Sequence, residues 1–293
     1  MPFDRQRILE WPVPVVHQDL RPRDTMLYAL AVGIGLDAVD PLQLPFVYEP
    51  GLRAAPTMAS VLAHPGFWMT DPSAGIDWEQ AVHGEQGLRI HRPLPVTGRL
   101  LGTTTVTDVV DKGVGKGALV LQERTVHDAE TGDLICTLTM TTFCRGDGGC
   151  GGPSSSPRPP LPPVPERRPD AVCDLPTLPH SALLFRLLGD GNPLHADPKV
   201  AHRAGFERPI LHGLCTLGVA GHALLRSLCS YDPSRLTAID VRFTAPVLPG
   251  ETIRTEMWRD GEDVSFRSTS LESGRVVLDR GHARVARADD TSA

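Results

Sequence analysis

The chain has 293 residues, of which 41% are hydrophobic and 22% are charged. This length and composition are typical of a globular protein with two domains of roughly 100–200 residues each. The net charge of -6 and the lack of a basic tract argue against nucleic acid as a partner. No run of about 20 apolar residues occurs, so no membrane-spanning helix and no membrane partner are expected.

The two ends of the sequence carry no targeting signal that we can identify. The first residues lack the apolar core of a signal peptide, and the final Asp-Asp-Thr-Ser-Ala differs from a peroxisomal Ser-Lys-Leu address. We therefore expect a cytoplasmic location. The six cysteines include no Cys-x-x-Cys pair, and with no sign of export they are expected to be reduced structural thiols.

Two helices and three strands are expected in the first half of the chain. The first helical pattern covers Thr25–Gly33, and a second, introduced by a proline, lies near 56–62. Three runs rich in Val, Thr, Leu and Ile follow near 99–111, 118–128 and 133–144. Turns rich in Gly and Asp separate these runs, a pattern that predicts an antiparallel meander.

The second half repeats this order of elements. A helical pattern covers Ser181–Gly189, and a second apolar helix follows Pro209. Three β-like runs are then expected near 251–259, 263–271 and 275–286. The repetition of helix, helix and meander indicates an internal duplication.

A segment rich in Gly, Ser and Pro separates the two halves. It has no apolar periodicity and cannot build a core, so it predicts a linker that is flexible at first and stiffer where prolines accumulate. The sequence therefore predicts an N-terminal domain (1–145), a linker (146–170) and a C-terminal domain (171–293).

The apolar helix expected over residues 214–228 constrains the architecture. It is apolar on most sides, and such a helix is usually enclosed. A sheet that buries one face needs a partner layer. A strongly curved antiparallel sheet wrapped around a central helix satisfies both demands, so the fold class expected is α+β, with this unit present twice.

The densest polar cluster is Gly189-Asp-Gly-Asn-Pro-Leu-His195, directly after an apolar helix. Its glycines and Asn-Pro pair predict a turn, which can aim Asp190, Asn192 and His195 at one point. A carboxylate and an imidazole can together hold and deprotonate a water molecule and return a proton to carbon. The alternative is a purely structural turn, since Asp, Asn and Gly favour turns. The corresponding turn after Gly33 lacks the histidine and the Asn-Pro pair, which favours chemistry in the second half only.

A second candidate lies at Pro209-Ile-Leu-His-Gly213, just before the apolar helix. The first N–H groups of a helix have no partner within it, so the Gly213 N–H could bind a substrate oxygen. A plain helix start is the alternative. His195, His202 and His212 match no compact metal-ligand spacing, so no metal is expected.

These segments resemble the MaoC-like, hydratase 2 family of (R)-specific enoyl-CoA hydratases. The resemblance rests on Phe185-Arg-Leu-Leu-Gly-Asp-Gly-Asn-Pro-Leu-His195 and Pro209-Ile-Leu-His-Gly-Leu-Cys-Thr-Leu-Gly218 in the second half. It extends to Arg92-Pro-Leu-Pro in the first half and Arg242-Phe-Thr-Ala-Pro-Val-Leu-Pro-Gly250 in the second. Nearly the whole chain is covered.

The resemblance implies a tandem double hotdog in which the second half is catalytic and the first half accommodates the acyl chain. Asp190 and His195 would activate water, Asn192 would support them, and the Gly213 N–H would bind the thioester oxygen. No cofactor is implied beyond the CoA of the substrate, and a homodimer is expected. The residues that would contact the substrate or its CoA ester are His83, Gly84, Lys112, Gly191, Pro193, Leu194 and Phe243. Some relatives carry a bulky aromatic residue at the position of Gly191.

Three functions compete at this stage. The first is reversible hydration of trans-2-enoyl-CoA to (3R)-3-hydroxyacyl-CoA in fatty-acid or related acyl-CoA metabolism. The second is dehydration of 3-hydroxyacyl groups on an acyl carrier protein, which the net charge of -6 disfavours because such carriers are acidic. The third is a non-catalytic acyl-CoA-binding subunit, which the intact Asp190, Asn192 and His195 disfavour.

Overall fold

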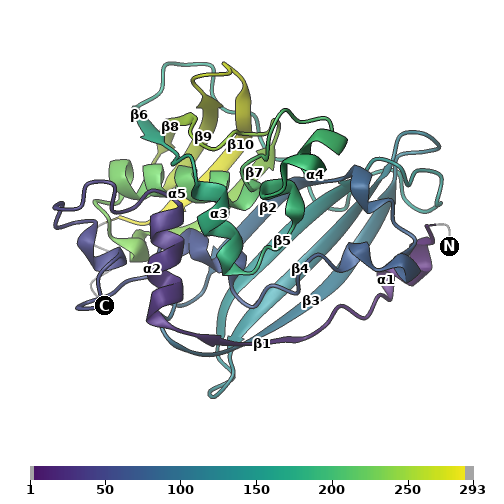
Figure 1. The fold of residues 1–293 in the computed structure, drawn as a ribbon, viewed down its shortest axis with the longest axis horizontal. Helices are drawn as coiled ribbons and strands as arrows, with labels where there is room; N and C mark the ends of the chain where they lie inside the picture. Colours follow the sequence, from purple (N-terminus) through teal and green to yellow (C-terminus); the bar gives the residue numbers. More distant parts are fainter. Residues whose placement is uncertain (1–2, 288–293) are drawn as a thin grey trace.

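The computed structural model describes residues 3–287, so the C-terminal residues considered above for targeting lie outside the described residues. Ten strands form one antiparallel sheet in the order β1-β3-β4-β5-β2-β7-β10-β9-β8-β6 (Figure 1). The strands are β1 (Val16–Leu20), β2 (Ala81–Ile90), β3 (Gly98–Asp111), β4 (Ala118–Asp128), β5 (Leu134–Cys144), β6 (Ala171–Pro176), β7 (Leu236–Phe243), β8 (Thr252–Asp260), β9 (Asp263–Ser270) and β10 (Val276–Val285).

The strand order is symmetric about the junction of β2 and β7. Five strands of the first half lie on one side, five strands of the second half lie on the other, and each set has the same order outward from the junction. The two junction strands pair antiparallel from Glu85 opposite Arg242 to Arg89 opposite Ala238. The expected α+β double hotdog is therefore confirmed.

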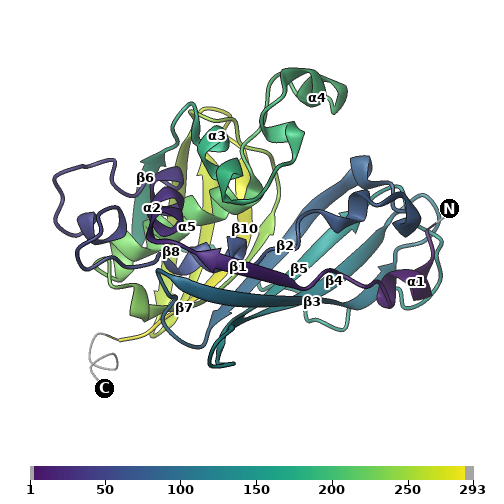
Figure 2. The same ribbon diagram turned by 60° about the horizontal axis from the view of Figure 1, so that its bottom comes forward.

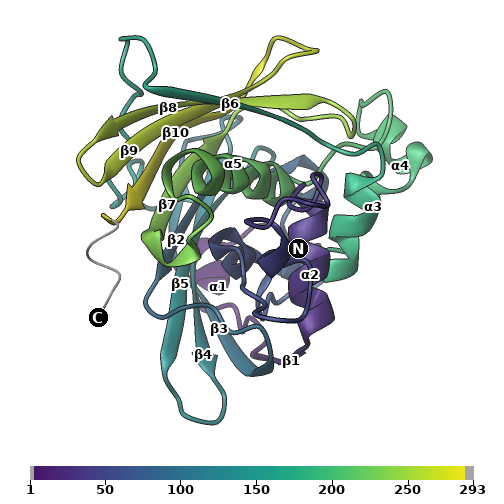
Figure 3. The same cartoon turned by 90° about the vertical axis from the view of Figure 1, so that its left-hand side faces the viewer.

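The helix α5 (Gly213–Leu228) lies inside the curve of the sheet, next to α2 (Pro22–Ala31) (Figure 3). Residues 215–225 are all buried, as the apolar composition of this helix predicts. The helix ends where Ser230 and Tyr231 both take positive φ values, of 52° and 59°. The remaining α-helices among the described residues are α1 (Arg5–Leu9), α3 (Ser181–Phe185) and α4 (Pro198–Arg203).

The second helix expected in the first half is not an α-helix. Residues Pro56–Val61 form the short 3-10 helix η2, which packs against α5 inside the shared sheet. Two features prevent a longer helix here. Ala63 takes a positive φ of 43°, and His64 precedes Pro65, which disfavours the helical conformation of His64. A single long helix therefore serves both halves of the sheet.

The six strands expected from sequence are confirmed to within one residue at each end. Four strands had not been expected, namely β1, β2, β6 and β7. They include both edges of the sheet and both strands of the junction. The meanders could thus be read from the sequence, whereas the strands that join and complete the halves could not.

The segment between β5 and β6 contains no helix or strand over the predicted linker, residues 146–170. Its glycine-rich part is nevertheless anchored, because the Asp111 carboxylate accepts hydrogen bonds from the N–H groups of Gly149 and Gly151 at 2.8 and 2.7 Å. The Arg158 side chain donates to the Gln122 carbonyl oxygen at 3.2 Å. The segment thus lies against the first half and is less free than its composition suggests; the domain boundaries stay a prediction.

Buried apolar side chains form two clusters. The larger one surrounds α5 and includes residues from both halves. The smaller one lies at the far end of β3 and β4, where α1 and residues 68–76 cover the sheet (Figure 2). The six cysteines are free thiols, five of them buried. None of the described helices is long and apolar enough to cross a membrane.

The close approach of η2 to α5 predicts the effect of a methyl group at Gly221. A Cβ atom there would lie 2.5 Å from Thr57 Cγ2, which is closer than van der Waals contact allows. We expect Gly221→Ala to destabilise the fold by about 1–3 kcal/mol, as overpacked cores do. Helix propensity alone predicts the opposite sign, a gain of about 1 kcal/mol. Urea unfolding followed by circular dichroism decides between them, and a more stable variant would contradict the packing described here.

Candidate active site

The turn after α3 holds Asp190, Asn192 and His195 in a fixed arrangement. A 3-10 turn, Arg186–Leu188, follows α3 and ends at Gly189, whose φ of 110° suits glycine. The Asp190 carboxylate then accepts a hydrogen bond from the Asn192 N–H at 3.1 Å. The Asn192 side-chain oxygen accepts from the Leu194 N–H at 3.0 Å and so begins the 3-10 helix that ends at His195. Asn192 therefore positions the other two residues.

The buried His195 has one ring nitrogen fixed by the backbone. Its Nδ1 lies 2.8 Å from the carbonyl oxygen of Ile210. A carbonyl oxygen can only accept, so Nδ1 carries the hydrogen and donates it. In the neutral ring Nε2 then has a free lone pair. This is the tautomer that a general base acting through Nε2 requires.

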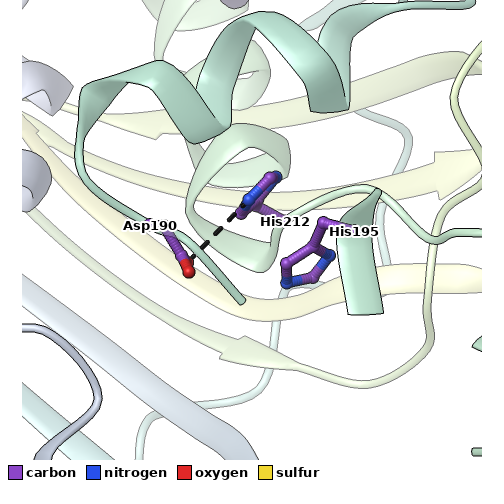
Figure 4. A group of neighbouring side chains, drawn as sticks. All are labelled: Asp190, His195 and His212. Carbon is purple, nitrogen blue, oxygen red and sulfur yellow. Dashed lines mark ion pairs between the residues drawn. The ribbon is translucent and has the colours of Figure 1, made fainter. Parts of the chain in front are cut away.

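His212 completes the cluster, although the sequence analysis had not included it in the site. Its ring stacks on that of His195, with 3.7 Å between centroids (Figure 4). The centroid of the Phe185 ring lies 5.0 Å from that of His212. The His212 Nε2 lies 4.0 Å from a carboxylate oxygen of Asp190. The side chain is 1% exposed, and neither ring nitrogen has a hydrogen-bond partner among the described residues. Its place just before Gly213 in the sequence was the signal that could have indicated it.

Burial keeps both imidazoles uncharged. It lowers the pKa of His212 to about 2, with the neighbouring His195 as a second cause. Burial also lowers the pKa of His195 below its usual value, although the Ile210 carbonyl and the Asp190 carboxylate oppose this shift. Both rings are therefore neutral at pH 7, and His195 is available to accept a proton.

α5 begins at Gly213, directly after His212 in the chain. A Cβ atom at Gly213 would lie 3.2 Å from the Phe243 ring, so glycine permits the close packing of that ring. The Phe243 ring lies 4.5 Å from the ring of His83 on β2. The structure thus brings His83 and Phe243, one from each half, together beside the helix start.

The other residues expected at the substrate are more dispersed. Gly84 lies at a β-bulge between His83 and Glu85. Gly191 and Pro193 are exposed in the turn, and Leu194 is half-buried. Lys112 lies beyond β3, three strands away from β2, where its ammonium group donates to the Ser154 carbonyl oxygen at 3.2 Å.

Three side chains in the cluster could ligate a metal ion. Asp190, His195 and His212 each offer a ligand atom, and these atoms all lie within 4.8 Å of one another. Imidazole and carboxylate donors of this kind suit zinc. His202, the third histidine considered from the sequence, is exposed on α4 and does not belong to the cluster.

The fold is a double hotdog whose second half carries the clustered side chains of Asp190, His195 and His212. Residues 161–280 match the family model of the MaoC like domain, and residues 19–146 match that of the MFE-2 hydratase 2 N-terminal domain. The chain belongs to this MaoC-like, hydratase 2 family.

The chain is similar to relatives of nearly the same length. A Mycobacterium tuberculosis protein named 3-hydroxyacyl-thioester dehydratase Y is 43% identical over 88% of this chain and 90% of its own. An Arabidopsis thaliana protein named enoyl-CoA hydratase 2, peroxisomal, is 38% identical over 94% of each chain. The solved structure of a MaoC-like dehydratase from Phytophthora capsici has a TM-score of 0.82 at 35% identity, covering 96% of this chain and 98% of its own.

The stacked histidines predict a distinctive titration. We expect the His195 midpoint below pH 6.5 and no titration of His212 between pH 5 and pH 8, because burial disfavours both cations. Asp190→Asn removes a negative charge and should lower the His195 midpoint further. Nuclear magnetic resonance of the imidazole ring signals measures these values, and a His195 midpoint above 6.5 would show that the ring is not held neutral by burial.

Proposed function

We propose that this protein reversibly hydrates trans-2-enoyl-CoA to (3R)-3-hydroxyacyl-CoA. The observation that carries the proposal is the fixed His195 tautomer, whose free Nε2 lies in one cluster with the Asp190 carboxylate. A neutral imidazole and a carboxylate are the pair needed to bind and deprotonate a water molecule. The names of the Mycobacterium and Arabidopsis relatives, a thioester dehydratase and an enoyl-CoA hydratase, support the same reaction in its two directions.

Each residue has a defined part in the reaction. His195 Nε2 accepts a proton from the water held between it and Asp190, while the water oxygen adds to C3 of the enoyl group. Negative charge then develops on the thioester oxygen, where the Gly213 N–H at the start of α5 stabilises it, a contribution of about 3 kcal/mol for one such donor. The proton returns from the His195 and Asp190 pair to C2, so one water molecule supplies both new bonds.

His212 is a positioning residue in this mechanism. Its neutral ring supports one face of His195 and adds no positive charge beside it. Asn192 has a similar part, because its N–H and its side chain fix the turn that carries Asp190. We further propose that His83, Gly84, Lys112 and Phe243 contact the CoA ester, and that Gly191, Pro193 and Leu194 line the substrate.

The cytoplasmic location and the homodimer also stand as proposals. The Arabidopsis relative carries the word peroxisomal in its name, so a peroxisomal location is the alternative. Cell fractionation tests the location. Light scattering on the purified protein tests the dimer, which the two-hotdog chain does not require because it already pairs two halves through β2 and β7.

Replacement of the acid–base pair tests the function directly. We expect Asp190→Asn and His195→Gln each to lower kcat for hydration of crotonyl-CoA by about 10²–10⁴-fold, the usual contribution of a general acid or base. The measurement is loss of the conjugated thioester absorbance, with an (R)-specific dehydrogenase identifying the product. His202→Gln is the matched control, since this exposed histidine lies outside the cluster, and it should keep full activity. Retained activity in both site variants, or an (S) product, would refute the assignment.

The same assay separates the competing functions. A higher rate on carrier-protein thioesters than on CoA thioesters would instead favour the carrier-protein dehydratase. Tight acyl-CoA binding with no change in enoyl absorbance would favour a non-catalytic subunit.

Treatment with a chelator tests whether the cluster works without a metal. We expect turnover to be unchanged after incubation with EDTA and gel filtration, because the proposed steps use only Asp190, His195 and the Gly213 N–H. Loss of turnover that added zinc restores would contradict this and assign a metal to Asp190, His195 and His212.

A further inference from the structure

Polar side chains interrupt the apolar inner face of the first half. Along β4 the inward positions, two residues apart, are Val120, Gln122, Arg124 and Val126, none more than 7% exposed. Val120 belongs to the smaller apolar cluster and Val126 to the larger one. Gln122 and Arg124 therefore lie between the two clusters, at positions where apolar side chains would join them into one core.

Neighbouring strands extend this polar region. Gln86 of β2 and Gln122 of β4 both pair with Met140 of β5, and Thr104 of β3 pairs with Arg124. All four polar side chains are buried. We call Gln86, Thr104, Gln122 and Arg124 the inner polar band. Its residues come from three strands, β2, β3 and β4, and β5 contributes Met140 between Gln86 and Gln122.

The band leaves hydrogen-bond donors without acceptors. An Arg124 Nη2 donates to the Ser60 carbonyl oxygen at 2.6 Å, and Trp68 Nε1 donates to the Gln122 side-chain oxygen at 2.8 Å. Arg124 Nε and Gln122 Nε2 have no partner among the described residues. An unsatisfied buried donor costs about 1–3 kcal/mol, and more when it is charged.

Within residues 3–287, no carboxylate pairs with the Arg124 cation. Burial lowers its pKa to about 10, and the opposing electrostatic contribution comes from the Cys136 thiol rather than from a carboxylate. Buried arginines are normally paired, because the loss of hydration is otherwise not offset. The Arg124 guanidinium therefore requires an oxygen acceptor, and an anionic acceptor would satisfy it best.

The band begins beside the candidate active site. The His83 ring packs on Phe243, which in turn packs on Gly213. The His83 Nε2 is buried and has no hydrogen-bond partner in the part of the chain that the structure describes. Arg124 is close enough to lower the pKa of His83, although burial is the main cause. Strand spacing and rise place the Arg124 Cα about 17 Å from that of His83, so a ligand reaching from the thioester to Arg124 must be long.

We propose that the inner polar band binds an oxygen-bearing end of the acyl chain, such as a terminal carboxylate, so that the protein favours long enoyl thioesters with a polar tail. This inference rests on the proposed hydratase function. Arg124 and Gln122 supply donors, and the ligand supplies acceptor oxygens. Because Arg124 lies under η2, the region suits the buried end of an acyl chain rather than the hydrated phosphates of CoA.

A matched pair of substrates tests the proposal in the unaltered protein. trans-2-Dodecenoyl-CoA is compared with the same thioester carrying a terminal carboxylate, and the hydration rate gives kcat/KM for each. We expect the carboxylated substrate to be favoured at least about tenfold, since a site built to donate hydrogen bonds rejects an analogue that lacks the acceptor. No preference, or a preference for the plain chain, would overturn the proposal.

Variants assign the preference to the band. Arg124→Met should abolish the preference for the carboxylated substrate and leave crotonyl-CoA hydration within about twofold, because a short acyl group does not reach Arg124. Arg124→Lys keeps the charge and should keep part of the preference. Equal loss of activity on all three substrates in Arg124→Met would indicate a structural role and refute the proposal. If crotonyl-CoA is not hydrated at all, the proposed function fails, and calorimetric binding of saturated dodecanoyl-CoA with and without the carboxylate still tests the band.

Discussion

The pairing of β2 with β7 is the interaction on which the site depends. It joins two five-stranded halves into one sheet, and the Arg242–Glu85 and Arg89–Asp240 ion pairs, both at 2.6 Å, bridge the same two strands. A slip of one residue in this register would turn every side chain of one half to the opposite face. The fixed register is therefore the condition under which His83 of one half meets Phe243 of the other at the start of α5.

A single long helix serving both halves explains the asymmetry between them. The space that a second helix would occupy is limited by α5, which η2 approaches so closely that glycine is required at position 221. Short segments cover the rest of the inner face of the first half, and their backbone carbonyls, such as that of Ser60, meet polar side chains of β4. The first half, which lacks the Asp–Asn–His turn, thus has buried polar side chains where an ordinary core would have apolar ones.

Local sequence patterns predicted the elements that depend on local physics. The meander strands alternate β-branched and polar residues between Gly and Asp turns, so their bounds could be read directly. The junction strand β2 reads Ala-Val-His-Gly-Glu-Gln-Gly, which is a poor strand pattern. Its Gly87 is required because a Cβ there would lie 2.5 Å from Thr139 and 2.6 Å from Asp240 on the two flanking strands. This constraint on Gly87 exists only once three strands are assembled. The position of His212 against His195 is likewise a product of the tertiary fold, so local sequence patterns could not predict it.

The burial that keeps the histidines uncharged also limits the stability of the fold in acid. The folded pKa values of His83 and His222 are lowered to about 4, and that of His212 to about 2, chiefly by burial, whereas the unfolded chain titrates near 6.5. Below pH 6.5 the unfolded state therefore binds more protons, and stability that is fully present above this pH falls as the pH approaches the folded values. At pH 5 each such histidine costs about 2 kcal/mol of the free energy of unfolding. Greater exposure of His212 would relieve this cost. It would also hydrate the His212 ring, which stacks on His195, and so favour the His212 cation. A neutral general base at this position and resistance to acid are therefore opposing demands on the same buried cluster.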